Sequence, residues 1–230
     1  MLTNWIPADQ ESLTAFVIMC MLMIGVIFRT VWVAGYKPIR FFWIAGIYLV
    51  VYSGIVISGL PAKYILPLFP LLFLSVFVAA VSFAFSNFGT AIINRLEIRY
   101  LIGFQAFRIP LEIILHRWSE LGTIPPTMTW TGQNIDILSG ILALIAFFFK
   151  KEWVRLNWAV NSIGFVLLLN TLRVVNLSSP FPFSLALEHP LQLVAHFPYA
   201  LIGPLFVGVA LSLHLMTFRK LTNHRLNDWI

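Results

Sequence analysis

The feature that most constrains the fold of this chain is a series of seven apolar runs separated by short polar stretches. Their approximate bounds are 13–33, 41–60, 65–86, 98–117, 135–149, 156–177 and 191–217. A helix needs about 20 mostly apolar residues to cross the hydrocarbon core of a bilayer. Because 60% of the residues are hydrophobic and 10% are charged, a soluble domain could not bury this apolar surface. The sequence therefore predicts an all-α, polytopic membrane protein whose residues 1–230 form one bundle of seven transmembrane helices.

The basic residues predict how this bundle is oriented. If the N-terminus lies outside, most of the lysines and arginines fall on the cytoplasmic side, as Arg29, Lys37, Arg40, Arg95, Arg99, Lys150, Lys151, Arg155, Arg219, Lys220 and Arg225. Only Lys63 and Arg117 fall outside, while Arg108 and Arg173 lie within runs. Short cytoplasmic loops of membrane proteins carry an excess of Lys and Arg. We expect a multi-pass protein of a plasma membrane, most simply a bacterial inner membrane, with a cytoplasmic C-terminus.

Several functional classes receive no support from the sequence. The net charge of +6 comes from loops between apolar runs, which indicates topology rather than nucleic-acid binding. The acidic start MLTNWIPADQES does not resemble a cleavable signal. One cysteine, Cys20, excludes an intrachain disulfide, and no glycine-rich phosphate loop, CxxC pair or HExxH motif occurs. No family is recognised.

The fourth run contains a polar stripe. In FQAFRIPLEIILH, residues 104–116, four polar side chains recur at helical spacing: Gln105, Arg108, Glu112 and His116. At 100° per residue they fall within an arc of about 80°. Ionisable groups inside a membrane are costly and face protein or a cavity. We expect Arg108 and Glu112 to pair along the helix, either as a packing device or as part of a functional site.

Other polar residues are predicted at the same outer level of the membrane. They are Asn134 and Asp136 at the start of the fifth run, Asn170 and Arg173 near the end of the sixth, and His196 early in the seventh, after Glu188 and His189. Pro198 and Pro204 predict a kink in the seventh run. His214 follows His196 by 18 residues, about 27 Å along a helix, and is expected at the inner interface.

These positions predict a pocket open to the outer side that binds a small polar or anionic ligand, as in a transporter or a receptor-like sensor. The candidate binding residues are Gln105, Arg108, Glu112, His116, Asn134, Asp136, Asn170, Arg173 and His196. No catalytic residue and no cofactor is assigned. One alternative is a metal-dependent hydrolase in which Glu112, His116, Asp136 and His196 hold zinc. A haem held by His116 and His196 also stays open, as does a scaffold without a ligand. The oligomeric state is not predicted.

Overall fold

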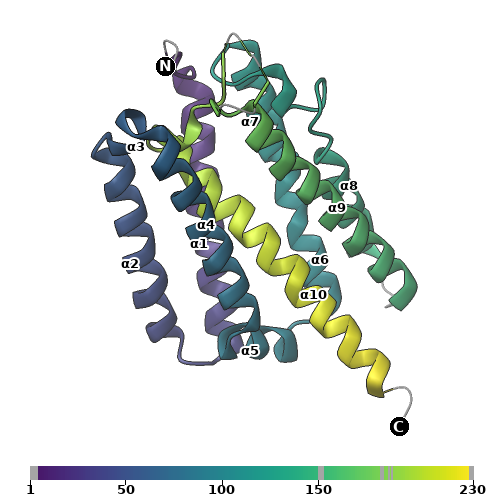
Figure 1. The fold of residues 1–230 in the computed structure, drawn as a ribbon. Coiled ribbons are helices and arrows are strands. Elements are labelled where there is room, and N and C mark those ends of the chain that lie inside the picture. The colour runs from purple at the N-terminus through teal and green to yellow at the C-terminus, as the bar shows by residue number, and fades with distance from the viewer. Residues whose placement is uncertain (1–4, 150–152, 182–183, 186, 188, 228–230) are drawn as a thin grey trace.

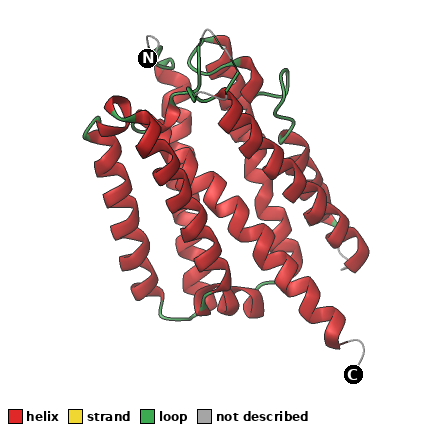
Figure 2. Cartoon of the chain, in the orientation of Figure 1, coloured by secondary structure: helices red, strands yellow, loops and turns green. Residues whose placement is uncertain are grey.

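The computed structural model describes residues 5–149, 153–181, 184, 185, 187 and 189–227. Every regular element in these ranges is a helix, and none is a strand, which confirms the all-α prediction (Figure 2). Three residues of the predicted topology and outer polar level lie outside the described residues: Lys150, Lys151 and Glu188. The side chain of Arg225 lies outside them too.

Five helices are long and apolar enough to cross a membrane. They are α1 (Gln10–Ala34), α2 (Pro38–Ile57), α4 (Ile65–Phe85), α9 (Val154–Ser178) and the stretch Tyr199–Asn223, whose regular part is α10 (Gly208–Asn227). Their length and composition indicate a membrane-embedded chain. The short helix α3 (Leu60–Lys63) connects α2 to α4, and the short helix α5 (Asn87–Arg95) follows α4.

Local sequence signals explain where α1 begins and ends. The Asp9 carboxylate accepts a hydrogen bond of 2.8 Å from the Ser12 N–H, which caps the start of the helix. At the other end Gly35 has a φ of 74°, and its N–H reaches the carbonyls of Val31 and Trp32. A left-handed residue at this position is the common way to stop a helix, and glycine adopts it without steric cost.

The fourth and fifth apolar runs are less regular than predicted. The fourth is divided into α6 (Ile98–Gly103), a 3-10 turn η1 (Phe104–Phe107) and α7 (Arg108–Glu120). Pro110 has no N–H to offer the carbonyl of Ala106, so the hydrogen-bond pattern changes here. The fifth run forms α8 (Ile137–Phe148), shorter than a usual crossing helix. The short helix η2 (Pro126–Met128) lies in the loop between them.

The seventh run differs from its predicted bounds. Regular α-helix begins only at Gly208, after two 3-10 turns, η3 (Leu193–Ala195) and η4 (Tyr199–Leu201), and the π-helical segment η5 (Gly203–Val207). The irregular stretch contains both prolines, so the predicted interruption is confirmed and is more extensive than a kink.

The helices form one bundle around α10 (Figure 1). α10 contacts α4 on one side and α6 and α9 on the other, so it joins the group α1, α2 and α4 to the group α6–α9. The start of α1 and the end of α10 lie at opposite ends of the bundle (Figure 1). At its centre, α7, α8, α9 and α10 surround a set of polar side chains.

Candidate functional site

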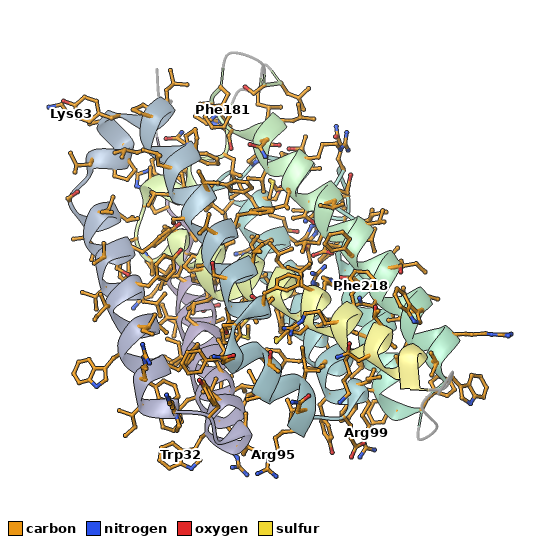
Figure 3. All side chains as sticks on the ribbon, turned by 60° about the horizontal axis from the view of Figure 1, so that its bottom comes forward. Trp32, Lys63, Arg95, Arg99, Phe181 and Phe218 are labelled. Atoms are coloured by element: carbon orange, nitrogen blue, oxygen red, sulfur yellow. The ribbon has the colours of Figure 1, made fainter. Side chains whose placement is uncertain are left out.

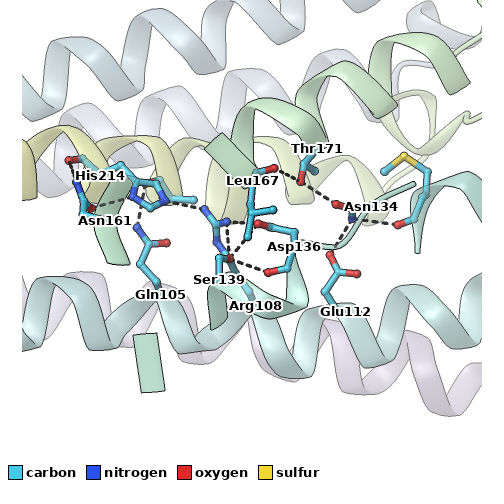
Figure 4. Close-up of polar contacts among 12 residues, drawn as sticks. Gln105, Arg108, Glu112, Asn134, Asp136, Ser139, Asn161, Leu167, Thr171 and His214 are labelled. Carbon is cyan, nitrogen blue, oxygen red and sulfur yellow. Dashed lines mark hydrogen bonds and ion pairs between the residues drawn. The ribbon is translucent and has the colours of Figure 1, made fainter. Parts of the chain in front are cut away.

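A buried polar cluster occupies the middle of the bundle (Figure 4). Its members come from four apolar runs and the loop before α8, and all of them are buried: Gln105, Arg108, Glu112, Asn134, Asp136, Ser139, Asn161, Thr171 and His214. Burial of so many polar groups is tolerable only when they bond one another.

Arg108 is at the centre of one half of this cluster (Figure 4). Its guanidinium forms an ion pair with the carboxylate of Asp136 and donates a hydrogen bond of 2.8 Å to the hydroxyl of Ser139. The Ser139 hydroxyl lies 2.9 Å from the Asp136 carboxylate and 2.7 Å from its carbonyl. Asp136 directly precedes α8, so the start of that helix brings the counter-charge to the arginine.

Gly140 allows α8 to approach the arginine this closely. A Cβ atom at Gly140 would lie 2.9 Å from Cγ1 of Ile109 and 3.2 Å from Cβ of Arg108. Because contacts under 3.0 Å require a displacement, any larger residue would push the start of α8 away. The glycine therefore helps to set the distance between Asp136 and Arg108.

His214 continues the cluster on the other side of Arg108. Its Nε2 lies 3.2 Å from the guanidinium and its Nδ1 lies 2.9 Å from Oδ1 of Asn161. Since a guanidinium only donates, Nε2 must accept, and Nδ1 must carry the proton that Asn161 receives. The Asn161 amide in turn donates to the His214 carbonyl at 3.2 Å. This network fixes His214 as a neutral imidazole in one tautomer.

Asn134 organises the other half of the cluster, beside Glu112 (Figure 4). Its amide donates to Oε1 of Glu112 at 2.9 Å and to the carbonyl of Met128 at 3.1 Å. Its carbonyl oxygen accepts from the Thr171 hydroxyl at 2.8 Å. One fully buried side chain thus joins α7, the loop before α8, and α9.

Glu112 is not fully bonded. Its Oε2 is buried and has no hydrogen-bond partner among the described residues. Gln105 is similar, because its amide donates to the carbonyl of Ala210 at 3.2 Å while its buried Oε1 lacks a partner in the same part of the chain. A buried acceptor without a donor is costly, so each such atom needs an explanation.

A cavity of about 110 Å³ lies beside Glu112. Apolar side chains of α4, α9 and η5 form most of its wall, among them Phe69, Phe73, Val76, Leu168, Leu172 and Phe206. Arg108, Glu112, Asp136 and Thr171 form its polar part. The cavity thus combines apolar walls with a few buried polar groups, the usual composition of a ligand pocket.

Two predictions about individual residues are wrong. Arg108 pairs with Asp136, not with Glu112, because Asp136 at the start of α8 lies directly against the guanidinium, whereas Glu112 accepts a hydrogen bond from Asn134. His214 is 2% exposed in the bundle core and does not lie at an interface. The sequence predicts a helix from residue 191 in the seventh run, but its regular helix begins at Gly208. The position of His214 along the bundle therefore differs from the predicted one.

The remaining predicted residues lie outside the buried cluster. His116 stacks on Trp130 with ring centroids 4.3 Å apart, and His196 stacks on Trp5 at 4.0 Å. Arg173 bonds Oδ1 of Asn170 at 3.0 Å, and Asn170 bonds the carbonyl of Gln133 at 2.8 Å. Arg173 is therefore not a partner of Glu112, and none of these four side chains lines the cavity described above.

The proposed zinc ligands are not brought together. Within the described ranges, no group of three or more His, Cys, Asp and Glu side chains could hold a metal ion. Glu112 and Asp136 lie in the buried cluster, whereas the two histidines stack on separate tryptophans. His116 and His196, the two candidate haem ligands, are not brought together either, because each stacks on a different tryptophan.

Four members of the cluster were missed by sequence reasoning: Ser139, Asn161, Thr171 and His214. Signals for two of them were present. Ser139 follows Asp136 by three residues, so both lie on one face of a helix. Asn161 lies in an apolar run, where a polar side chain needs a partner.

Comparison of the chain with protein-family models, with curated proteins and with solved structures gave no match. Function is therefore inferred from the site itself.

Proposed function

We propose that the chain crosses the membrane seven times, with its N-terminus outside and its C-terminus in the cytoplasm of a bacterial cell. Five long apolar helices support this, together with two further segments. The continuous helical stretch from Ile98 to Glu120 is long enough for a sixth crossing despite its 3-10 turn. The apolar helix Ile137–Phe148 and the turn before it would form the seventh, because irregular backbone is tolerated where protein surrounds it.

We further propose that the cavity beside Glu112 binds a small polar ligand, in a transporter or a receptor-like sensor. The observation that carries this proposal is the free Oε2 of Glu112, which is buried at the cavity wall. A carboxyl group in this position is expensive unless something supplies a hydrogen bond or a positive charge.

The charges of the cluster indicate which ligands would fit. Asp136 already balances Arg108, and His214 is neutral through its bonds to Arg108 and Asn161. Glu112 is the one carboxyl of the cluster that no cation pairs with among the described residues. This balance of charges in the cluster favours a ligand with a cationic or hydrogen-bond-donating group over an anion. Since a cavity of roughly 150 Å³ holds benzene, the ligand would have only a few heavy atoms.

Binding can be measured with purified protein in detergent. The probes are n-butylammonium, n-butanol and butyrate, which share a chain length and differ in charge. A probe that binds the folded state raises the Tm with its concentration. We expect n-butylammonium to stabilise the wild type most and butyrate least. Stabilisation by butyrate alone would contradict the charge assignment.

Variants test the role of Glu112 directly. Glu112→Gln keeps an acceptor for Asn134 and removes the charge, so we expect it to weaken n-butylammonium binding by about 10- to 100-fold. Glu120→Gln is the matched control, because Glu120 lies on the same helix but is exposed at its end. Equal binding by wild type and Glu112→Gln would reject the proposed site. If Glu112→Gln does weaken binding, uptake of the probe into proteoliposomes distinguishes a transporter from a sensor.

A further inference from the structure

A second and larger cavity lies away from the polar cluster, between α1, α2, α4 and α10. Its volume is about 930 Å³, and its wall is almost entirely apolar. Ligand pockets measure roughly 300–1,000 Å³, so this cleft is large enough for a substantial molecule.

The packing of α2 explains why the cleft exists. At one end Phe41 packs against Phe83 with ring centroids 5.2 Å apart, and Phe42 stacks on Phe28 at 4.2 Å. At the other end the Tyr52 hydroxyl donates to the carbonyl of Ala200 at 3.3 Å. These bulky contacts hold both ends of α2 in place.

Between these contacts, small residues line the middle of the cleft. Ala45 and Gly46 of α2 lie in its wall together with Ala79 and Ala80 of α4. No heavy atom comes within 4 Å of a Cβ built on Gly46. Small facing residues usually let membrane helices come close, but here the aromatic contacts keep them apart. α2 is consequently the least buried of the five long helices.

Such an apolar space would not hold ordered water, because water needs polar partners. It matches the chemistry of a hydrocarbon chain. The cleft also includes Thr30, Ser86 and Tyr100, which lie where α1, α5 and α6 approach the end of the bundle that carries Trp32 and Arg95 (Figure 3). One end of a bound chain would therefore reach the membrane surface at this level.

Basic side chains gather at that end of the bundle. They are Arg29 in α1, Lys37 and Arg40 at the start of α2, and Arg95 at the end of α5, and all are exposed. Glu97 is the only acidic residue in the sequence between Ser12 and Leu111, and it pairs with Arg99 at 2.7 Å. Within the described residues, none of the four basic side chains has an acidic partner. The surface charge here is complementary to a phosphate headgroup.

We propose that this cleft binds an anionic phospholipid, with an acyl chain between α2 and α4 and its headgroup at Arg29, Lys37, Arg40 and Arg95. Basic residues near a membrane surface attract anionic lipids, each by roughly fivefold in affinity. The proposal does not depend on the ligand of the central cavity, which shares no lining residue with this cleft.

The full-length protein, exchanged from vesicles of equal phosphatidylglycerol and phosphatidylcholine into a mild detergent, provides the test. Native mass spectrometry then counts the retained lipids. We expect wild type to retain phosphatidylglycerol over phosphatidylcholine by about tenfold or more. Equal retention of the two lipids would mean an ordinary lipid annulus and would overturn the proposal.

Two pairs of variants separate the acyl and headgroup contributions. Gly46→Leu fills the cleft and should lose the retained lipid, whereas Gly54→Leu, on the same helix and also with no atom within 4 Å, lies outside the cleft wall and should keep it. The double variant Lys37→Gln with Arg40→Gln should lower the preference for phosphatidylglycerol by on the order of tenfold. Lys63→Gln, at the opposite end of the bundle, is its control (Figure 3). Retention by Gly46→Leu at the wild-type level, with an unchanged Tm, would contradict a site in the cleft.

Discussion

The guanidinium of Arg108 pairs with the carboxylate of Asp136, which lies 28 residues further along the chain. This contact joins the fourth apolar run to the fifth inside the bundle. It also leaves Glu112, four residues from Arg108 on the same helix, free to face the cavity through one oxygen. The two carboxyl groups of the cluster therefore have different environments, one paired and one available.

The first prediction concerns the buried ion pair. Asp136→Ala leaves Arg108 without its counter-charge and should lower the free energy of unfolding by about 3–5 kcal/mol. The double variant Arg108→Leu with Asp136→Leu should recover most of this loss, because no isolated charge remains. Thermal unfolding in detergent measures both, with the exposed Glu120→Ala as control. A stable Asp136→Ala protein would show that the pair does not hold the bundle together.

The second prediction concerns Asn134. Asn134→Ala removes the donor to Glu112 and Met128 and the acceptor for Thr171, so it should cost roughly 1–3 kcal/mol. Thr171→Ser, which keeps the hydroxyl, should behave like the wild type. Thr171→Val should lose part of the stability, since Asn134 then has an unbonded oxygen. Equal Tm values for the serine and valine variants would argue against this hydrogen bond.

The third prediction uses two helical glycines. A Cβ at Gly164 would lie 2.8 Å from Cε1 of His214, so Gly164→Ala should move the imidazole and destabilise the protein. Gly25 has open space around its Cβ position, so Gly25→Ala should stabilise by about 0.5–1 kcal/mol through helix propensity. Opposite shifts in Tm for the same chemical change are expected. Stabilisation by both substitutions would mean that His214 is not packed against α9 as described.

The fourth prediction concerns pH and the start of α1. The Ser12 N–H, followed by Arg117, lowers the pKa of Asp9 below its ordinary value of 3.8. A group whose pKa is lower in the folded state stabilises that state above its ordinary pKa. This contribution is lost as the pH falls from the ordinary value through the folded-state pKa.

Asp9→Asn is the matched variant, because asparagine also caps helices but does not titrate. The difference in Tm between wild type and Asp9→Asn should be constant above about pH 5 and shrink below about pH 4. A difference that does not change with pH would exclude a contribution from the Asp9 charge.

The fifth prediction tests topology. In a Cys20→Ala background, single cysteines at Lys63 and Asn94 lie on exposed positions of α3 and α5 at opposite ends of the bundle. A membrane-impermeant thiol reagent applied to intact cells should label position 63 and spare position 94 until the cells are opened. Labelling in the reverse order would invert the proposed orientation, and labelling of both positions from outside would mean that the segments between them do not separate the two sides.

The sequence by itself determined the helical, membrane-embedded character of this protein and the polar stripe of its fourth apolar run. Both follow from composition and periodicity, which act over a few turns of helix. The interruption near Pro198 and Pro204 was also predictable, because proline removes a backbone donor wherever it occurs.

The tertiary structure decided which polar groups meet. Arg108 had Glu112 as its nearest candidate in sequence, but the close approach of α8 at Gly140 supplied Asp136 instead. His214 entered the cluster because Gly164 leaves room for its ring and the irregular start of the seventh run changes its position. Partners of a buried charge depend on helix packing and register across the bundle, and these are set by contacts between segments distant in the chain.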